Sequence, residues 1–375
     1  MSGTSADGID AALVEITGSG TNTNFRLRAF STYPYPKGFR DYLLKNSDRA
    51  SARIDEIARA DILIARFFAD AARKIARKGG YPLSRIDFIG SHGQTIHHLP
   101  EPKSLFGKTV RSTFQIGNPS VIAKLTGTLT VADFRSGDIA AGGSGAPLVP
   151  LFDYLTLRSR SLHRGALNIG GIANITVLPR ACTPDDVIAF DTGPGNMVID
   201  DLAQRYYRLR YDRGGRIAST GKIEPRLLRW MVTHPYFKLP PPKSTGRETF
   251  GEDFVRQIIR RAARFSPADI IATATEFTAL SIFQSYFRYI RPRYRLSEIF
   301  VSGGGVHNAY LMDALRRYFQ GVDLHISDRE NISADAKEAI CFALLANETL
   351  SGHPGNIPRV TGARRKAILG VIALP

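Results

Sequence analysis

The sequence predicts an α/β fold in two lobes, and three observations support this prediction. The chain has 375 residues, which exceeds one ordinary hydrophobic core and is enough for two domains. Short apolar runs alternate with amphipathic stretches, which favours an α/β fold over a β-sandwich. Glycine-rich turns adjoin the apolar runs throughout the chain, at 1–10, 167–174, 190–196 and 300–308.

The elements of the first half follow from hydropathy and from helix-breaking residues. Strands are expected at 9–16 and 25–33, joined by a turn of Gly, Ser, Thr and Asn residues. An amphipathic helix is expected over 53–78, ended by Gly79-Gly80. Its apolar side consists of Ile54, Ile57, Ile64, Phe68 and Ile75. The remaining elements are a strand at 86–89, a helix at 117–127 and a strand at 131–134.

The second half repeats this pattern, which suggests two related lobes. Its expected strands are 166–170, 173–178, 187–190 and 298–302. Two helices are expected to begin near Phe250 and near Asp269. Two further helices are expected over 309–319 and over about 334–346. The segment 352–362 holds two prolines and three glycines and predicts a linker that returns the chain to the first lobe. We therefore expect an N-terminal lobe of 1–130 plus 355–375 and a C-terminal lobe of 131–354.

Composition narrows the class of protein. A hydrophobic content of 43% and a charged content of 22% are typical of a globular protein. The sequence contains no apolar run of about 18 residues and no secretory signal, so neither a membrane span nor export is predicted. The two cysteines, Cys182 and Cys341, lie far apart, which fits a reducing compartment and gives no disulfide framework or zinc site. These features predict a cytoplasmic protein.

The net charge of +16 is the unusual feature of the composition. Such a balance is typical of proteins that bind nucleic acid, a membrane surface or an anionic substrate. Here the arginines are scattered at helical spacing beside aromatic residues, which favours solvated helix faces over a nucleic-acid stripe. No nucleic-acid-binding signature accompanies them, so no nucleic-acid partner is predicted.

The first glycine-rich turn has the composition of a phosphate site. It offers hydroxyls, backbone donors and carboxylates that suit phosphates and Mg²⁺. A plain hairpin turn is the alternative, since Gly, Ser and Asp also favour one, and a Walker A pattern is absent. The residues of this candidate loop are Gly3, Thr4, Ser5, Ala6, Asp7, Gly8, Ile9 and Asp10.

Asp191 is the candidate general base. It ends an apolar strand and opens a glycine turn, a position where the strand fixes the carboxylate and the turn admits substrate. A simple capping role is the alternative. The neighbouring hairpin at 168–174 would bring backbone donors and Asn174 to the same place. Glycines at the later turns suit a nucleotide: Gly170, Gly171, Gly193 and Gly195 with Asn196, then Gly303, Gly304 and Gly305.

Other polar segments are weaker candidates. Arg135 is expected either to hold an anionic group in bidentate fashion or to pair with Asp133 or Asp138. The histidines at 92, 97 and 98 have the wrong spacing for a zinc site on one helix face. Pro240–Glu248 is expected at the surface, either as a flap over a phosphate or as a stiff loop. The metal ligands are not identified.

Together these blocks resemble the anhydro-N-acetylmuramic acid kinase family, in order, from residue 1 to about 370. The blocks are less specific to the substrate, because fungal levoglucosan kinases share most of them. The matching blocks are Met1–Asp10, His92–Thr95, Gln115–Gly117, Asp133–Arg135, Gly145–Pro150, Asn168–Asn174, Phe190–Asn196, Pro242–Glu248 and Val301–Asn308.

The resemblance implies an actin/sugar-kinase/Hsp70-like fold with two ribonuclease-H-like domains and ATP between them. It implies a reaction in which a base activates water to open a 1,6-anhydro sugar while O6 takes the γ-phosphoryl group of ATP. Asp191 would be the base, and Gly3 to Asp10 would be the phosphate loop. Thr95, Arg135, Asn174 and Glu338 would lie at or near the sugar, and a homodimer is implied.

One departure concerns the start of the chain. In the family, residues before the Met-Ser-Gly-Thr-Ser block form the first strand of the N-terminal lobe, and here the sequence begins at that block. Loss of a central strand would leave ladder groups unpaired. Gly117–Ser120 also departs from the family pattern. Two alternatives therefore stand beside the main interpretation: a levoglucosan kinase, and a catalytically impaired homologue that binds nucleotides or polyanions.

Overall fold

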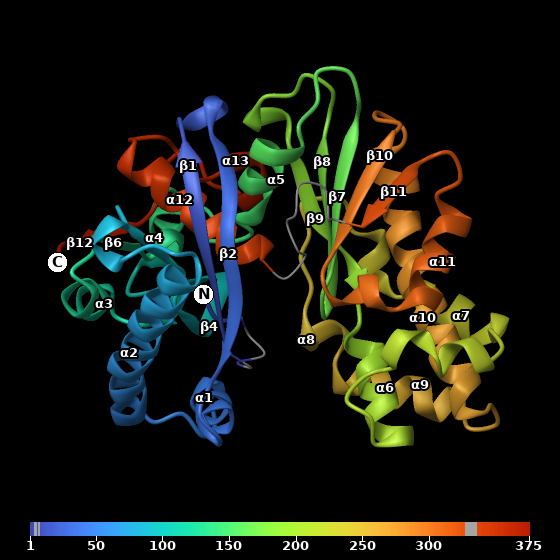
Figure 1. The fold of residues 1–375 in the computed structure, drawn as a ribbon. Helices are drawn as coiled ribbons and strands as arrows, with labels where there is room; N and C mark the ends of the chain where they lie inside the picture. Colours follow the sequence, from blue (N-terminus) through green and yellow to red (C-terminus); the bar gives the residue numbers. More distant parts are fainter. Residues whose placement is uncertain (4–5, 7, 327–335) are drawn as a thin grey trace. The chain divides into compact units, whose positions relative to one another are not determined.

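The chain folds into two compact α/β units (Figure 1). The computed structural model describes residues 1–3, 6, 8–326 and 336–375. Unit 1 comprises Met1–Leu155 with Asn331–Pro375, and unit 2 comprises Thr156–Glu330. Two segments expected in the C-terminal lobe, 131–155 and 331–354, therefore group with unit 1. The sequence could not show this grouping, because it depends on helices that pack on strands distant in the chain.

Unit 2 is built on a five-stranded sheet with strand order β11-β10-β7-β8-β9. Strands β7, β8 and β9 form an antiparallel meander, while β10 and β11 run parallel to β7. This is the strand order of the expected ribonuclease-H-like core. The strands are β7 (Arg164–Ile169), β8 (Ile172–Leu178), β9 (Ile188–Pro194), β10 (Glu298–Ser302) and β11 (Asp323–Ile326).

Helix α10 (Pro267–Ser285) is the central helix of unit 2. It contributes to both hydrophobic clusters of this unit, because apolar residues occur on nearly every side of it, including Ile271, Phe277 and Ile282. A helix that is apolar all round is buried by neighbours on every side. The other helices of unit 2 are α6 (Met197–Tyr207), α7 (Pro225–Val232), α8 (Arg247–Phe250), α9 (Glu252–Arg261) and α11 (Ala309–Tyr318).

Unit 1 holds its strands in separate sheets. Strands β1 (Gly8–Thr17) and β2 (Asn24–Pro34) form one antiparallel pair, and β4 (Gln94–Leu105) and β5 (Lys108–Ile116) form another. A third sheet has the order β12-β6-β3. Its strands are β3 (Ile89–Ser91), β6 (Thr130–Ala132) and β12 (Val371–Ala373).

Helices surround the strands of unit 1. The longest, α2 (Ile54–Lys78), packs on β1 and β2, and α12 (Lys337–Leu350) packs on β1 and β3. The remaining helices are α1 (Phe39–Ser47), α3 (Pro119–Thr126), α4 (Phe134–Ala140), α5 (Val149–Leu157) and α13 (Pro358–Thr361).

Strongly periodic elements agree with the sequence-based expectation. The expected strands at 9–16 and 25–33 and the helix at 53–78 are confirmed within one residue, as is β10. Gly79 caps α2 and Gly80 takes a φ of +80°, which confirms the stop signal. Ile54, expected on the apolar side of α2, is 80% exposed because it is the first residue of that helix.

Weakly patterned elements do not agree. The strand expected at 86–89 lies at 89–91, and the strand expected at 131–134 ends at Ala132. The β4–β5 hairpin, α1 and α4 were not predicted. Prolines interrupt the alternation in β4, and α4 is short and contains a glycine. The expected linker at 352–362 is partly buried, since Asn356 and Thr361 are both held by hydrogen bonds to Asp138.

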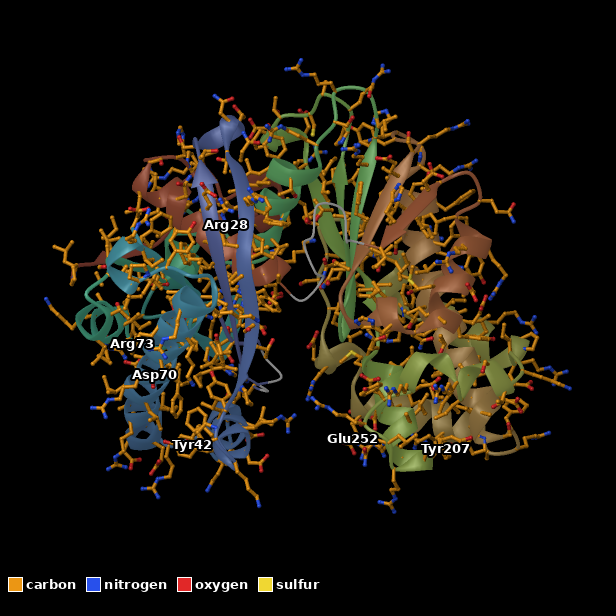
Figure 2. The ribbon with its side chains drawn as sticks, in the orientation of Figure 1. Arg28, Tyr42, Asp70, Arg73, Tyr207 and Glu252 are labelled. Atoms are coloured by element: carbon orange, nitrogen blue, oxygen red, sulfur yellow. The ribbon has the colours of Figure 1, made fainter. Side chains whose placement is uncertain are left out.

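Several arginines project from helix faces beside acidic neighbours. Arg73 and Asp70 lie one turn apart on α2, with Nη1 3.0 Å from Oδ1 (Figure 2). Similar pairs join Arg205 to Asp201 on α6 and Arg316 to Asp313 on α11. This is the arrangement expected of solvated helix faces. No helix among the described residues is long and apolar enough to cross a membrane.

The N-terminus of α10 offers a test of the fold of unit 2. Ser266 caps this helix, and Ser266 and Asp269 form a reciprocal capping box. We expect Ser266→Ala to lower the free energy of unfolding of this unit by about 1 kcal/mol. Urea denaturation followed by the fluorescence of Trp230, the single tryptophan, measures this loss. Ser161→Ala, an exposed loop change, serves as the control, and equal unfolding of both variants would contradict the prediction.

Candidate active site

Three of the glycine-rich turns meet at the carboxyl end of β7 in unit 2. The β7–β8 turn contains Gly170 and Gly171, β9 leads into Gly195 and Asn196, and β10 leads into Gly303–Gly305. The carbonyl group of Ile169 lies among them: it accepts a hydrogen bond from Asn196 Nδ2 at 3.2 Å. Ligands of open α/β sheets bind at the carboxyl ends of parallel strands. The structure therefore brings the expected nucleotide glycines together.

The backbones at this junction approach too closely for side chains. A Cβ atom added at Gly195 would lie 2.3 Å from the carbonyl oxygen of Gly170, and one at Gly305 would lie 2.4 Å from Ile169 Cγ2. At Gly303, which has a φ of +84°, an added Cβ would lie 2.7 Å from the Ile169 carbonyl oxygen. Glycine is required at these positions by close packing and, at Gly303, also by conformation.

Several backbone donors of these turns are already engaged. The N–H groups of Gly195 and Met197 donate to the carbonyl of Gly171, and the N–H of Asn196 donates to that of Gly170. These hydrogen bonds lock the two turns together. A phosphate at this place would have to be bound by other groups. Gly304 and Gly171 have the most open surroundings, since an added Cβ would meet only Asn196 Nδ2 at 3.7 Å and Met197 Cβ at 3.9 Å, respectively.

Asp191 lies on β9 directly opposite Asn174 on β8. The sequence placed Asp191 just after its strand, whereas β9 continues to Pro194. A β-bulge between Ala173 and Asn174 interrupts the ladder at this point. Bulges often re-aim side chains next to functional sites. Cross-strand partners share one face of a sheet, so the structure brings Asp191 and Asn174 together as expected.

The segment 240–248 folds onto Asp191. The carbonyl of Lys243 accepts a hydrogen bond from the Asp191 N–H at 3.1 Å, and the N–H of Thr245 donates to Asp191 Oδ2 at 2.9 Å. The hydroxyl of Tyr236 donates to the Asp191 carbonyl at 2.6 Å. These contacts fix both the backbone and the carboxylate of Asp191. The segment that was expected at the surface is thus part of this site.

The environment of Asp191 suits a base that works near neutral pH. Burial raises the pKa of its carboxyl to about 6, and the N–H of Thr245 offsets part of this effect. The carboxylate of Glu248 raises the pKa further, and the ammonium of Lys243 lowers it. A general base is most effective when its pKa lies near the operating pH, so Asp191 is ionised yet basic at pH 7.

Lys243 was not recognised from the sequence as a site residue. Its ammonium nitrogen lies 4.5 Å from the ring centroid of Tyr236, 5.0 Å from that of Tyr289 and 6.0 Å from that of Phe190. Aromatic faces attract a cation at such distances. Burial lowers the pKa of Lys243 to about 8. The aromatic cage therefore anchors the segment that holds Asp191, a relation that only the folded chain reveals.

In unit 1, the first glycine-rich turn is held by Gln94. Its Nε2 donates to the carbonyl of Gly3 at 3.2 Å, and its Oε1 accepts from Ser2 Oγ at 2.6 Å. Ala6 is buried and takes a φ of +51°. The candidates Thr4, Ser5 and Asp7 lie outside the described residues. At the end of the turn, Asp10 Oδ1 accepts a hydrogen bond from Thr32 Oγ1 at 2.6 Å, and Gly8 and Ile9 begin β1.

Arg135 is fixed by neutral partners. Its Nε donates to His92 Nε2 at 3.0 Å, and its Nη1 donates to the Gly145 carbonyl at 2.9 Å. Burial lowers the pKa of His92 well below its usual range, so its ring is neutral and carries its proton on Nδ1, which lies 3.1 Å from the Gly93 carbonyl. Asp133 accepts a hydrogen bond from the N–H of Ser136, and Asp138 accepts one from the N–H of Gly145. Arg135 is a buried cation that interacts electrostatically with Glu338.

Glu338 and Thr95 complete the candidates in unit 1. Glu338 lies in the first turn of α12; partial desolvation raises the pKa of its carboxyl, and the charge of Arg135 opposes that rise. Thr95 lies on β4, where its hydroxyl accepts a hydrogen bond from Gln115 Nε2 at 3.2 Å. Arg135 and Glu338 thus interact electrostatically within unit 1; their place at a sugar stays a prediction.

The described residues contain no group of three or more His, Cys, Asp or Glu side chains that could hold a metal ion. His98 faces Thr113 Oγ1 at 3.0 Å, and His97 accepts from Arg49 at 3.1 Å. With His92 bound to Arg135, the three histidines therefore have separate roles.

Comparison with known proteins gives one consistent result. A family model described as "Anhydro-N-acetylmuramic acid kinase" matches residues 1–375. Curated proteins of that name match this chain over its whole length. One from Salinibacter ruber is 45% identical, and the match covers 95% of that protein. One from Caldanaerobacter subterraneus is 43% identical, and the match covers 96% of that protein. One from Bacillus cereus is 42% identical and 98% covered.

The titration of Asp191 tests the electrostatics of this site. Carbon-13 NMR of the Asp191 carboxyl should give a pKa of about 6. Glu248→Gln removes a neighbouring negative charge and should lower this pKa, whereas Lys243→Met removes a positive charge and should raise it. Glu252→Gln, on the adjacent helix α9, should leave it unchanged. Equal pKa values in all four proteins would contradict this account.

Proposed function

Because the chain belongs to the anhydro-N-acetylmuramic acid kinase family, we propose that it is an ATP-dependent kinase acting on 1,6-anhydro-N-acetylmuramic acid. The products are N-acetylmuramic acid 6-phosphate and ADP. We place the reaction in the cytoplasm, where the two buried free cysteines, Cys182 and Cys341, stay reduced.

The proposed reaction couples two bond exchanges. Water attacks the anomeric carbon as Asp191 takes its proton, and the bond between C1 and O6 breaks. The electron pair left on O6 attacks the γ-phosphorus of ATP, and ADP departs. Phosphoryl transfer needs mainly positioning and charge neutralisation. One carboxylate base is then sufficient, because the phosphoryl group neutralises the charge that develops on O6.

The observation that carries this proposal is the environment of Asp191. Its carboxylate is fixed by the N–H of Thr245 and faces Asn174 across the sheet. Burial holds its pKa at about 6, which makes it a stronger base than an exposed aspartate while it stays ionised at pH 7. An aspartate that only capped a turn would not need the β-bulge, the aromatic cage around Lys243 and the segment 240–248 to position it.

Glycine-rich turns would bind ATP. We assign the nucleotide to Gly303–Gly305 and the neighbouring turns of unit 2, and its phosphates to Gly3–Asp10. Mg²⁺ binds mainly through phosphate oxygens and water, with one or two carboxylates. Asp10, whose Oδ1 accepts a hydrogen bond from Thr32 Oγ1, would supply such a carboxylate. The ion would neutralise phosphate charge.

The sugar would be bound by Thr95, Arg135, Asn174 and Glu338. Arg135 is the group suited to the lactyl carboxylate of the substrate, because a guanidinium binds carboxylates through a fork of parallel hydrogen bonds. Its Nε and Nη1 already serve His92 and Gly145, which fixes the direction of the remaining donors. Levoglucosan lacks both the lactyl and the acetamido group, so this arginine distinguishes the two substrates.

Coupled ADP release with Mg-ATP tests the proposal. Turnover is expected with anhydro-N-acetylmuramic acid and not without sugar, and turnover on levoglucosan alone would contradict the substrate assignment. We expect Asp191→Asn to reduce kcat by about 10²–10⁴-fold, because it removes the general base. Asp313→Asn, an exposed change on α11, is the control. An active Asp191→Asn enzyme would refute the mechanism.

The pH profile gives a separate prediction. Because Asp191 must be ionised to accept a proton, kcat/KM should fall as the pH drops through about 6. Glu248→Gln should move this acidic limb to lower pH and Lys243→Met to higher pH, in parallel with the titration of Asp191. Profiles that stay in place while the pKa of Asp191 moves would show that another group is the base.

Arg135→Lys tests the role of the guanidinium. The variant keeps the charge and loses the planar fork, so KM for anhydro-N-acetylmuramic acid should rise by about tenfold, in line with one charge-assisted hydrogen bond. Weak turnover of levoglucosan, where it is measurable, should keep its KM because that sugar has no carboxylate. An equal rise in both KM values would assign Arg135 a structural role instead.

A further inference from the structure

Four polar side chains form one row across the central sheet of unit 2, whose strands β9, β8, β7 and β10 lie side by side (Figure 1). Asp191 on β9 is the cross-strand partner of Asn174 on β8. Asn174 is in turn the partner of Asn168 on β7, and Asn168 that of Ser302 on β10. Cross-strand partners share one face of a sheet. Ile169, the next residue along β7, belongs to the hydrophobic core, so the row lies on the face opposite that core.

The two asparagines of this row have unused hydrogen-bonding groups. Their side chains are half-buried, and in the part of the chain that the structure describes no group hydrogen-bonds to either amide. Asparagines that support the fold are engaged: Asn308 accepts from the Leu311 N–H at 3.0 Å, and Asn356 donates to Asp138 at 2.7 Å. A polar group shielded from water without a partner costs free energy. A bound ligand that supplies the partner recovers this cost.

Asn168 lies against two of the nucleotide turns. A Cβ atom added at Gly303 would lie 2.7 Å from Asn168 Oδ1, and one added at Gly170 would lie 3.7 Å from Asn168 Nδ2. Gly171, the next residue of the β7–β8 turn, is exposed, and its N–H donates to no group within the described ranges. Asn168 Nδ2 and the Gly171 N–H are therefore two unused donors at this turn.

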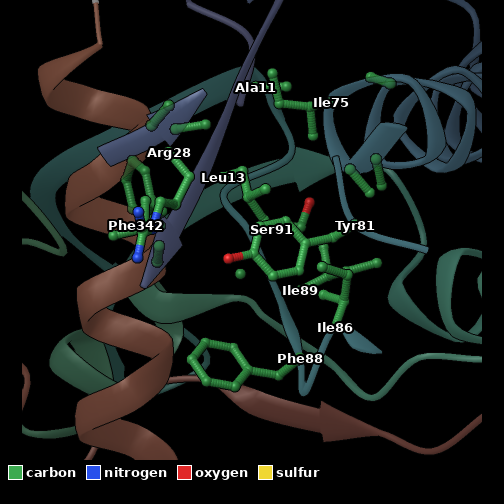
Figure 3. Close-up of a pocket in the computed structure, with 18 of the residues that line it drawn as sticks. Ala11, Leu13, Arg28, Ile75, Tyr81, Ile86, Phe88, Ile89, Ser91 and Phe342 are labelled. Atoms are coloured by element: carbon green, nitrogen blue, oxygen red, sulfur yellow. The ribbon is translucent and has the colours of Figure 1, made fainter. Parts of the chain in front are cut away.

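The cavity of unit 1 has a different chemistry. It has a volume of about 370 Å³, and most of its lining residues are apolar, among them Leu13, Ile75 and Phe342 (Figure 3). Arg28, which also lines it, pairs with Glu15, with Nε 2.8 Å from Oε2. This cavity therefore suits apolar groups better than a phosphate. A few convergent polar groups, rather than volume, indicate where a charged group binds.

The order of the row matches the order of the reacting groups in the proposed reaction. Asp191 is assigned to the water, Asn174 to the sugar and Gly303 to the nucleotide. The γ-phosphoryl group stands between sugar and nucleotide, as Asn168 stands between Asn174 and Gly303. Neighbouring strands lie about 4.8 Å apart, so Asp191 and Asn168 are separated by on the order of 10 Å. A water, the C1–O6 bond and a phosphoryl group in hydrogen-bond and attack contact span a length of the same order.

We propose that Asn168 is a catalytic residue whose Nδ2, together with the N–H of Gly171, binds the γ-phosphoryl group of ATP. The inference rests on the proposed function. As the bond from O6 to phosphorus forms, the bond from phosphorus to the bridging oxygen breaks and its electron pair leaves with ADP. Asn168 and Gly171 donate to non-bridging oxygens and exchange no proton. Fixed donors of this kind stabilise the charge on a transferring phosphoryl group.

A neutral donor suits this place in the row. A cation here would lower the pKa of Asp191 and make it a weaker base. A carboxylate here would repel the phosphate. The amide of Asn168 does neither, so the row binds an anion at one end and keeps a basic carboxylate at the other.

Calorimetric titration with Mg-ADP and with the Mg²⁺ complex of the β,γ-imido analogue of ATP tests this role without sugar. Because the two ligands differ in the γ-phosphoryl group, the ratio of their Kd values isolates the contacts of that group. We expect Asn168→Ala to weaken the analogue by about tenfold and to change the Kd of ADP by less than about twofold. Asn174→Ala, the same change one strand away on the same face, should leave the ratio as in the wild type.

Asn168→Leu separates phosphate binding from packing. Leucine fills nearly the same volume and has no donor, so this variant should lose affinity for the analogue as fully as Asn168→Ala. In both variants kcat should fall by about 10²-fold, while KM for the sugar is kept. Affinity restored by leucine would assign Asn168 a packing role and overturn the proposal, as would an unchanged Kd ratio in Asn168→Ala. A wild-type protein that binds neither nucleotide would instead refute the proposed function, and this inference with it.

Discussion

The close approach of backbone at the end of β7 is the constraint on which the candidate site depends. Gly170, Gly195, Gly303 and Gly305 allow three turns to meet around Ile169, with no space for a Cβ at Gly195, Gly303 or Gly305. Because Gly195 and Asn196 are tied to the β7–β8 turn, the end of β9 is fixed relative to β8. Asp191 lies on that strand, so its position follows from the glycines rather than from its own contacts alone.

The chemistry of Asp191 results from opposing effects, of which burial is the largest. Burial favours the protonated carboxyl, while the N–H of Thr245 and the ammonium of Lys243 favour the carboxylate. The same segment delivers Thr245, Lys243 and Glu248, and the cage of Tyr236, Tyr289 and Phe190 anchors it through Lys243. A change in the position of this segment would alter the contacts and the basicity of Asp191 together.

Sequence reasoning identified the glycine turns, Asp191, Asn174 and Arg135, because short motifs beside apolar runs have direct chemical meanings. It also located α2 from its helical periodicity and β10 from a short apolar run. It missed the β4–β5 hairpin and α4, where proline and glycine weaken the pattern, and it did not connect Lys243 to Asp191 or Gln94 to Gly3. Those contacts join residues that lie 52 and 91 positions apart, and no local pattern encodes them. The grouping of 131–155 with unit 1 was hidden for the same reason.

The central claim is that opening of the anhydro ring and phosphoryl transfer occur in one coupled event. Single-turnover reaction in ¹⁸O-labelled water, quenched rapidly and followed by mass spectrometry, tests it most directly. The account predicts one ¹⁸O atom on the anomeric carbon of the sugar phosphate and none on its phosphoryl group or as labelled inorganic phosphate. Label in inorganic phosphate, or labelled N-acetylmuramic acid that forms before its 6-phosphate, would contradict it.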